Sequence, residues 1–248
     1  MSRFQLMLTN KQIKLINSLH SKKGRLENEL FLVEGEKGIQ EVLDSSYEVE
    51  FLVINVDFQH LFSATSVPTF FLSKDEITKL STLTINQYGL AVVRSKSSNE
   101  ITPLDDVVLI LDGVRDPGNL GTIIRICDWY GIKQIVCSND STEFYNPKVI
   151  SATMGSFKRV ECMYVDLQDF LLSNPSHSII GADLAGENLH HYQFPQKVFI
   201  VMGSESHGIR PEVSKLIQQR ITIPRFGEAE SLNVAISTGI ILDHFRRS

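Results

Sequence analysis

The sequence predicts an α/β protein with two domains, the larger of them a parallel sheet covered by helices on both faces. Three observations predict this. Strand-like and helix-like segments alternate along the chain, Val107–Leu111 is an unbroken apolar run typical of a strand buried in a parallel sheet, and a polar, serine-rich stretch before Pro103 separates two such series. We therefore expect an α/β domain over residues 1–95, a linker over 96–105 and the parallel-sheet domain over 106–248. A chain of 248 residues, 42% hydrophobic and 21% charged, can bury such a core.

The first half starts with a helix that has one apolar face, because Ile13, Ile16 and Leu19 recur at helical spacing. Ser73 and Glu76 form the S-x-x-E pattern of a capping box, which predicts a helix that runs toward Leu80. Apolar, β-branched runs predict the strands. The expected helices are Lys11–Leu19, Glu36–Leu43 and 73–80, and the expected strands are Leu30–Val33, Val49–Val56, Val67–Leu72 and Tyr88–Arg94.

The second half is a longer series of the same kind. Gly131 is placed to end one helix, and Asn146 followed by Pro147 supplies the N-cap and the first residue of another. The expected strands are Val107–Leu111, Ile135–Cys137, Arg159–Val165, Ser178–Ala182, Val198–Met202 and Arg220–Ile223. The expected helices are Asn119–Tyr130, one that starts at Pro147, Leu167–Leu172 and Leu232–Arg247.

Positive charge gathers at the start of the chain. The formal net charge is −5, yet residues 1–26 contain six basic and no acidic residues, so the remaining 222 residues carry −11. Such asymmetry predicts a localised binding surface for a polyanion, and a solvated helix face is the alternative. The basic residues are Arg3, Lys11, Lys14, Lys22, Lys23 and Arg25.

Several common classes of protein do not fit the sequence. No apolar run approaches the ~20 residues that cross a bilayer, and the first residues lack the pattern of a secretion signal, so we expect a cytoplasmic protein with no membrane partner. Three cysteines without a CxxC pair predict neither a disulfide framework nor a zinc ribbon. The adjacent His190 and His191 cannot share a helix face as metal ligands do, so no metal is expected. Nucleotide-binding loops and the G-x-S-x-G elbow are also absent.

Three polar loops remain, each after an apolar strand. They cover residues 112–121, 203–208 and 223–233. Ligands of open α/β sheets bind beyond the carboxyl ends of the strands, so the three loops are expected to converge on one pocket. Glycines that merely make tight turns would explain each loop alone, but not the polar residues that accompany them: Asn119, Arg125, Glu205, Ser231 and Asn233.

The same loops resemble the three sequence motifs of the SpoU/TrmH family of RNA ribose 2′-O-methyltransferases, within the SPOUT superfamily. The motifs are Pro117-Gly-Asn-Leu-Gly-Thr-Ile-Ile-Arg125, Val201-Met-Gly-Ser-Glu-Ser-His-Gly208, and Ile223-Pro followed by Ser231-Leu-Asn-Val234. The resemblance covers roughly residues 106–248. The segments Lys22-Lys-Gly-Arg25 and Phe31-Leu-Val-Glu-Gly35 also resemble the RNA substrate-binding domain often fused to these enzymes.

The resemblance implies a deep C-terminal trefoil knot, which general rules of topology would not suggest. It also implies a pocket for S-adenosylmethionine and a homodimer with the active site near its interface. The implied cofactor-binding residues are Met202, Gly203, Ile223, Pro224 and Leu232, with Met154 and Ser156 from the family-like segment Ser151-Ala-Thr-Met-Gly-Ser156 as further candidates.

Arg125 is the central catalytic residue that the resemblance implies. A guanidinium is normally always charged, so two roles stay open: it accepts the proton of the ribose hydroxyl, or it binds the neighbouring phosphate and orients that hydroxyl. Asn119 is expected to orient the arginine or to cap its helix, and Glu205 to hold Asn119 or the knot backbone. Ser231 and Asn233 are expected either to hold the target nucleotide or to cap the last helix.

The resulting prediction is an S-adenosylmethionine-dependent enzyme that methylates a ribose 2′-hydroxyl, with ribosomal RNA favoured and transfer RNA as the alternative. Contacts to RNA are expected from Lys11, Lys14, Lys22, Lys23, Arg25 and Arg225. Arg225 stands where a methionine is frequent in the family, and the extra cation would suit a phosphate. A non-catalytic RNA-binding factor and an enzyme that modifies a base are less favoured, since the Arg125 motif is intact.

Overall fold

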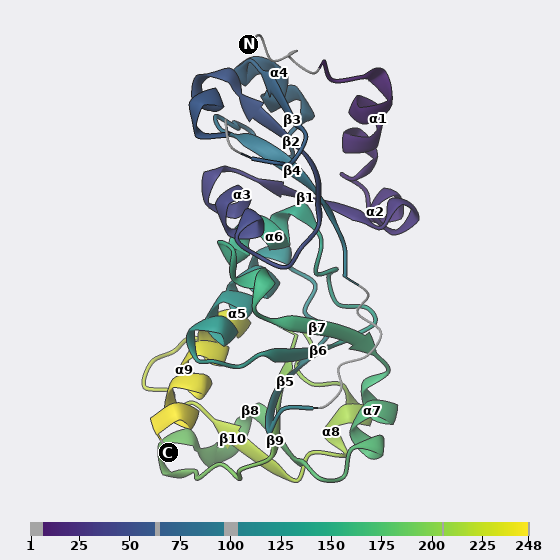
Figure 1. Cartoon of the computed structure of the whole chain (residues 1–248). Helices are drawn as coiled ribbons and strands as arrows, with labels where there is room; N and C mark the ends of the chain where they lie inside the picture. The colour runs from purple at the N-terminus through teal and green to yellow at the C-terminus, as the bar shows by residue number, and fades with distance from the viewer. Residues whose placement is uncertain (1–6, 63–64, 97–103, 205, 248) are drawn as a thin grey trace. The chain divides into compact units, whose positions relative to one another are not determined.

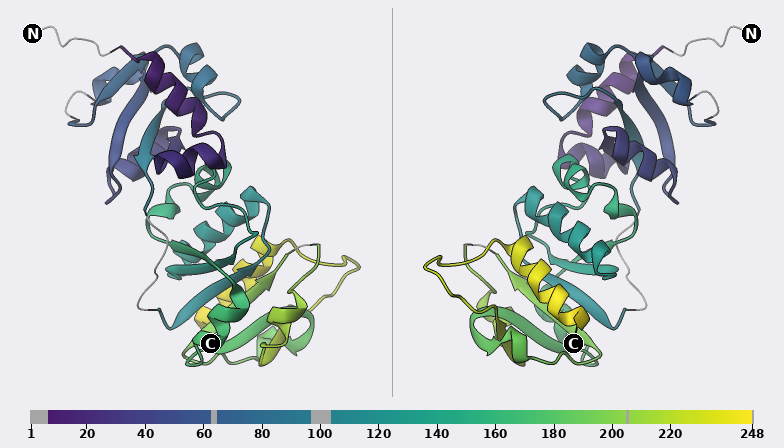
Figure 2. Two further views of the ribbon diagram at one scale, coloured as in Figure 1. Left: turned by 90° about the vertical axis from the view of Figure 1, so that its right-hand side faces the viewer. Right: turned by 90° about the vertical axis from the view of Figure 1, so that its left-hand side faces the viewer.

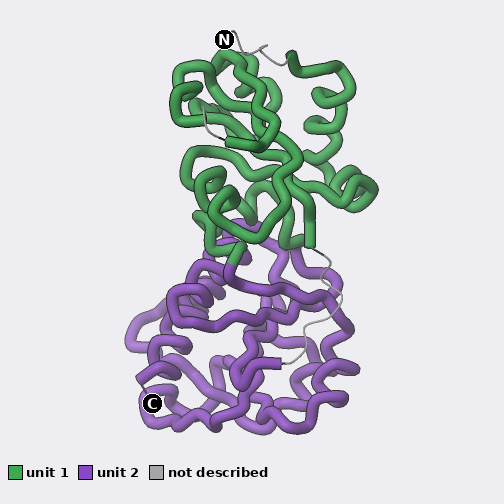
Figure 3. Tube along the Cα trace, viewed as in Figure 1, with its two compact units in different colours: residues 1–96, 143–158 green, residues 97–142, 159–248 purple. Residues whose placement is uncertain are grey.

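A computed structural model describes residues 7–62, 65–96, 104–204 and 206–247 of the chain. It divides into two compact units, shown in Figure 3. Unit 1 comprises residues 1–96 and 143–158, and unit 2 comprises residues 97–142 and 159–248. Most of the predicted linker, residues 97–103, lies outside the described residues. Each unit has its own sheet.

Unit 1 is built on a mixed four-stranded sheet of order β1-β4-β2-β3. Strand β4 runs antiparallel to β1 and to β2, whereas β2 and β3 are parallel. Helices α1 and α4 each begin with a capping box, at Thr9 and Ser73, and pack with the strands around a common apolar core. The elements are α1 Asn10–Ser18, α2 Lys22–Asn28, β1 Leu30–Glu34, α3 Glu36–Leu43, β2 Val49–Asn55, the 3₁₀ helix η1 Val56–Phe62, β3 Thr69–Leu72, α4 Lys74–Leu80 and β4 Gly89–Arg94.

Residues 143–158 belong to unit 1, although the sequence placed them in the C-terminal domain. This segment holds α6 (Pro147–Thr153) and η2 (Ser156–Lys158), and it packs through Tyr145, whose ring lies 4.4 Å from that of Phe31 in β1. Glu143 forms an ion pair with the buried Arg25. Contacts with residues more than 100 positions earlier decide this placement, and the local pattern of the segment does not reveal them.

Unit 2 is a six-stranded sheet in which every neighbouring pair is parallel, as predicted, in the order β10-β8-β9-β5-β6-β7. Helices α5 and α9 lie side by side, as Figures 1 and 2 show. The elements are β5 Val107–Asp112, α5 Pro117–Trp129, β6 Gln134–Ser138, β7 Glu161–Val165, α7 Leu167–Ser173, β8 Ser178–Asn188, η3 Leu189–His191, β9 Val198–Gly203, α8 Pro211–Ser214, β10 Gln219–Thr222 and α9 Val234–Arg247.

Every predicted strand and helix is present, with shifted ends. Gly131 ends α5 in a left-handed conformation (φ +67°), and Asn146 caps α6, both as predicted. Helix α2 was missed because its seven residues, Lys22–Asn28, show no apolar periodicity. Strand β8 runs six residues beyond its predicted end at Ala182, to Asn188, and it pairs with β10 in two registers that are separated by an irregularity between Arg220 and Ile221. None of the helices in the described residues is both long and apolar enough to cross a bilayer.

Candidate active site

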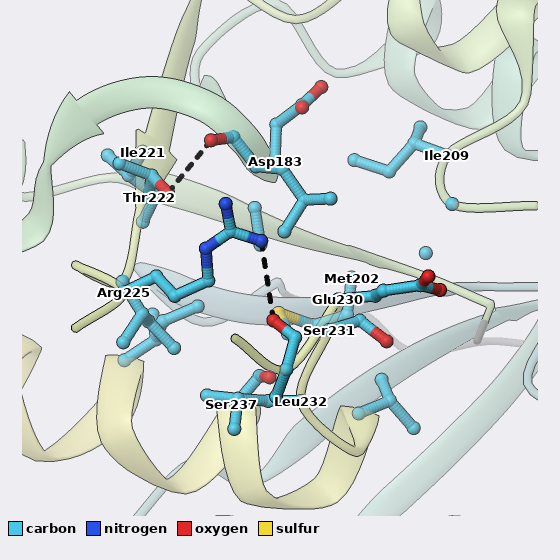
Figure 4. Close-up of a pocket in the computed structure, with 18 of the residues that line it drawn as sticks. Asp183, Met202, Ile209, Ile221, Thr222, Arg225, Glu230, Ser231, Leu232 and Ser237 are labelled. Atoms are coloured by element: carbon cyan, nitrogen blue, oxygen red, sulfur yellow. Dashed lines mark hydrogen bonds between the residues drawn. The ribbon is translucent and has the colours of Figure 1, made fainter. Parts of the chain in front are cut away.

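A pocket of about 680 Å³ lies against β8, β9 and β10 of unit 2. Three stretches of chain line it: residues 182–184 within β8, the end of β9 with the loop that follows it, and β10 with the loop before α9. Figure 4 shows their side chains around one space, with α9 below it. The last two stretches contain the second and third predicted loops, whereas no residue of the first predicted loop, 112–121, is among the lining residues. The volume is within the ~300–1,000 Å³ common for small-molecule sites.

The loop after β9 is folded tightly on itself. The N–H of Ser204 donates to the carbonyl of Gly208 at 3.1 Å, and the N–H of Gly208 donates back to the carbonyl of Ser204 at 2.9 Å. A Cβ on Gly203 would lie 2.2 Å from the carbonyl carbon of Gly208, so only glycine fits there. The structure thus explains the glycine by its contact with the loop itself, and its place in the cofactor site stays a prediction. Glu205, the predicted polar residue of the second motif, lies outside the described residues.

An ion pair ties this loop to the strand before the first motif. Asp112, whose carboxylate is fully buried at the end of β5, accepts from Nε of Arg210 at 2.6 Å and from its backbone N–H at 2.7 Å. These hydrogen bonds raise the pKa of the Arg210 guanidinium. Asp140 lies 3.6 Å from Arg210 and also pairs with Arg115. Hydrogen bonds lower the pKa of the Asp140 carboxyl, and the one from Arg115 has a larger effect than the one from Ser138.

The predicted cofactor residues separate into two groups. Met202, Gly203, Ile223, Pro224 and Leu232 all line the pocket. Met154 and Ser156 belong to unit 1 and are not among the lining residues, so the structure does not support them as part of this wall. Their segment, residues 151–156, resembles a family sequence, but its packing against the sheet of unit 1 also explains why those residues are there.

Asn119 and Asn233 join the first and third motifs directly. Nδ2 of Asn233 donates to Oδ1 of Asn119 at 2.9 Å, across 114 residues of sequence. Asn233 also accepts at Oδ1 from the N–H of Ala235, at 2.9 Å, and so caps α9 as the capping alternative predicted. Asn119 is not the cap of α5, which was its alternative: the helix begins at Pro117, and Asp116 accepts the N–H of Asn119.

Arg125 lies on the exposed face of α5, in line with Thr122 and Trp129. Its guanidinium forms no ion pair or hydrogen bond with any residue that the structure describes. The nearby carboxylate of Asp128 is held instead by Arg159, with Nη2 2.7 Å from Oδ2. Arg125 is thus a charged group that remains available to a ligand. Ser231 is exposed and lines the pocket.

The predicted RNA contacts also differ in their surroundings. Lys11, Lys14, Lys22 and Lys23 are exposed on α1 and α2 of unit 1. Arg25 is buried: its guanidinium donates to Glu143 from Nε at 3.0 Å and to the carbonyl of Leu19 from Nη1 at 2.7 Å. The prediction that Arg25 binds RNA is therefore wrong, because its donors are used inside unit 1. Arg225 lines the pocket of unit 2.

Sequence reasoning missed Asp112 and Arg210, and it also missed Asp183, which lines the pocket and pairs with Arg220 of β10. An acidic residue at the end of an apolar strand, as Asp112 is, was the one available signal. The basic partners lie 98 and 37 positions away, at spacings that no local pattern reports.

Comparison with known proteins agrees with this arrangement. Residues 106–243 match the model of the SpoU rRNA Methylase family, and residues 10–91 match the MRM3-like substrate binding domain. The chain belongs to the SpoU rRNA methylase family. In this family's motifs, Asn119 and Arg125 come from the first, the loop around Gly203 from the second, and Asn233 from the third.

Relatives of the family share both units. The 23S rRNA (guanosine(2553)-2′-O)-methyltransferase RlmP of Bacillus subtilis is 28% identical over 242 residues, 96% of each chain. A TrmH-family protein from Porphyromonas gingivalis has a TM-score of 0.87 at 35% identity, over 98% of this chain and 99% of its own. An AdoMet-bound rRNA methyltransferase from Sinorhizobium meliloti has a TM-score of 0.86 at 29% identity, over 97% and 96%. The predicted family, the predicted class of RNA methyltransferase and its cofactor, S-adenosylmethionine, are confirmed.

Proposed function

We propose that this protein methylates a ribose 2′-hydroxyl of 23S ribosomal RNA. The observation that carries the proposal is the hydrogen bond between Asn119 and Asn233, which joins two family motifs. It connects α5, which bears the exposed Arg125, with the start of α9, which borders the pocket. Ribosomal RNA is favoured because the Bacillus relative named for 23S rRNA matches nearly the whole chain, unit 1 included. Such a substrate places the enzyme in the cytoplasm.

The lining of the pocket fits S-adenosylmethionine by its chemistry. Apolar side chains, Met202, Ile223 and Leu232 among them, suit an adenosine group, and charged side chains of the loop before α9 suit an amino-acid group. When bound, the cofactor supplies an electrophilic methyl group. The tight turn at Gly203 and the ion pair of Arg210 with Asp112 hold the loop that forms one wall.

Arg125 orients the acceptor. A guanidinium stays protonated in nearly all protein settings and binds a phosphate through a planar fork, so an exposed, unpaired arginine suits a phosphate beside the target ribose. The role of proton acceptor is the alternative. Asn119 holds the start of α5, the helix that bears Arg125, to Asn233. Ser231 lies two residues before Asn233 and lines the pocket.

Unit 1 supplies RNA affinity through its exposed lysines. Lys11, Lys14, Lys22 and Lys23 lie on two short helices that pack on each other, within the part that matches a substrate binding domain. Ribose hydroxyls and phosphates are recognised mostly by shape and charge, which lysines on a rigid surface can provide.

The knot and the homodimer belong to the same proposal. Strand β10 pairs with β8 at an edge of the sheet. Residues 223–233 then lead the chain to α9, which packs on α5, and this course is consistent with a threaded C-terminus. Trp129 on α5 and Ile236 on α9 are 83% and 57% exposed. Such an apolar surface beside Arg125 suits a second copy of the chain.

The test is methyl transfer from labelled S-adenosylmethionine to purified ribosomal and transfer RNA, followed by mapping of ribose methylation. We expect label on a ribose of 23S rRNA. Label on transfer RNA alone would support the alternative substrate, and binding of RNA without transfer would support a non-catalytic factor.

Arg125→Ala separates chemistry from cofactor binding. We expect this variant to lose at least about 100-fold in kcat, the scale of one preorganised catalytic group, while S-adenosylmethionine binds as in the wild type. A parallel loss of cofactor affinity would contradict the role given to Arg125. Arg125→Lys with a pH–rate profile distinguishes the two roles, because lysine can lose its proton but cannot form the same fork.

A further inference from the structure

We infer that Arg225 binds the α-carboxylate of the cofactor and so makes this pocket selective for ligands that carry that group. The inference rests on the proposed function. It starts from the charges on the pocket wall, where three residues are permanently charged near neutral pH: Asp183, Arg225 and Glu230.

Asp183 is already neutralised. Its carboxylate forms an ion pair with Arg220 of β10 and accepts the N–H of Ala185 at Oδ1, at 3.1 Å. Arg220 is also bonded to Ser214, with Nη2 2.6 Å from the hydroxyl oxygen. This pair joins the middle of β8 to β10, and the charge of Asp183 is already balanced by Arg220.

Arg225 has nearly all of its donors free. Among the described residues its guanidinium makes one hydrogen bond, a long one of 3.4 Å from Nη1 to the carbonyl of Ala229. Figure 4 shows its side chain extended into the space that the lining residues enclose. The bond spans a four-residue turn of the same loop, so it presets the direction of the guanidinium without neutralising it.

Charge complementarity then identifies the ligand group. S-adenosylmethionine carries two cationic groups, the sulfonium and the ammonium, and one anionic group, the α-carboxylate. The guanidinium can pair only with the last, and its planar fork matches a carboxylate in bidentate geometry. Glu230, on the same loop and without a partner among the described residues, is the complementary charge for the ammonium.

A phosphate of RNA is the competing ligand for Arg225. The location of the arginine favours the cofactor, since residues on both sides of it along the chain, Ile223, Pro224 and Phe226, line the same pocket. The exposed lysines that we expect to bind RNA lie instead on helices of unit 1.

The experiment measures binding rather than activity. Isothermal titration calorimetry of the full chain compares S-adenosylmethionine with decarboxylated S-adenosylmethionine, which keeps the sulfonium and the amine and lacks only the carboxylate. For the wild type we expect about five- to tenfold weaker binding of the decarboxylated ligand, the scale of a partly exposed charge-assisted pair. For Arg225→Met we expect the affinity for S-adenosylmethionine to fall by the same factor and the affinity for the decarboxylated ligand to stay unchanged.

Two further variants complete the design. Arg225→Lys keeps the charge but not the fork, so an intermediate loss for S-adenosylmethionine supports the assignment. Lys215→Met makes the same change in net charge at an exposed residue outside the pocket, and it should alter neither affinity.

The outcomes are distinguishable. If Arg225→Met binds both ligands as the wild type does, or weakens both equally, the inference is overturned. If instead the variant loses affinity for RNA in a filter-binding assay while both cofactor affinities hold, Arg225 is an RNA contact. If the wild type binds neither ligand, the proposed function itself fails.

Discussion

The two units of this protein use arginine differently, and their sheets differ in strand direction. In unit 2 all strands of the sheet are parallel, so the loops that follow β5, β8, β9 and β10 leave from one edge, and the polar motif residues gather there. In unit 1, β1, β2 and β3 run in one direction and β4 runs against both of its neighbours, so the chain leaves β4 at the opposite edge of the sheet. A parallel sheet thus concentrates distant residues into one site, whereas the mixed sheet of unit 1 presents its lysines on covering helices.

Two arginines make the difference concrete. Arg25 is 5% exposed and shares its donors between Glu143 and Leu19, while Arg125 is exposed and has no partner among the described residues. Both stand in segments that resemble family motifs. The comparison teaches that a motif arginine holds the fold when a carboxylate is buried with it and is available to a ligand when none is.

Removal of each arginine in turn should affect the stability of the protein very differently. Arg25→Met leaves the carboxylate of Glu143 without its partner, so we expect the free energy of unfolding to fall by about 3–5 kcal/mol. Arg125→Met should change it by less than about 0.5 kcal/mol, because an exposed residue without contacts is removed.

Urea denaturation followed by circular dichroism measures both changes. Adding Glu143→Gln to Arg25→Met should recover part of the loss, since the unpaired charge is then gone. Equal stabilities for the two single variants would show that the burial of Arg25 has no energetic consequence.

A second buried pair tests whether the site of unit 2 depends on such a residue. Arg210→Met should lower the free energy of unfolding by about 2 kcal/mol, less than Arg25→Met. The loss is smaller because Arg210 is 39% exposed, so water can reach the carboxylate of Asp112 when the arginine is removed. Arg210→Met should also lower the affinity for S-adenosylhomocysteine several-fold in calorimetry, because the loop of residues 203–208 is then no longer held to Asp112. Arg25→Met should leave that affinity unchanged, and a loss of the same size in both variants would argue against a local effect.

The lysines of unit 1 should affect RNA binding and nothing else. Lys22→Gln together with Lys23→Gln should make the dependence of log K on log salt shallower by about 1.5, near the value for two phosphate contacts. Stability and cofactor affinity should stay as in the wild type. These point variants are sharper than deletion of residues 1–95, which would strip residues 143–158 of the sheet they pack on. An unchanged salt slope would mean that the lysines form only a solvated face.

The smallest expected effect concerns Asp140. Its pKa is lowered in the folded protein, so the stability it contributes is present above the unfolded pKa, about 3.9, and is lost as the pH falls through the folded value. Asp140→Asn should therefore reduce stability at pH 7 by less than about 1 kcal/mol, because the residue is partly exposed, and by still less at pH 3. Urea denaturation at the two pH values measures this, and a larger deficit at pH 3 would contradict the sign.

Much of the fold and part of the site could be predicted from local patterns. The run Val107–Leu111 predicted a buried strand, Ser73 and Glu76 predicted a helix start, and two of the three polar loops, residues 203–208 and 223–233, predicted walls of the pocket. Helix α2 escaped because it has no apolar period. The placement of residues 143–158 escaped because it depends on Arg25 and Phe31, far away in the chain.

What the sequence determined by itself is the alternation of elements, the order of the motifs and the kinds of residue in each loop, because periodicity and capping act over a few residues. The tertiary structure alone decided which polar residues meet. It paired Asn119 with Asn233 and Asp112 with Arg210, and it buried Arg25 while leaving Arg125 free. Those outcomes depend on desolvation and on contacts between segments about a hundred residues apart, which no local pattern encodes.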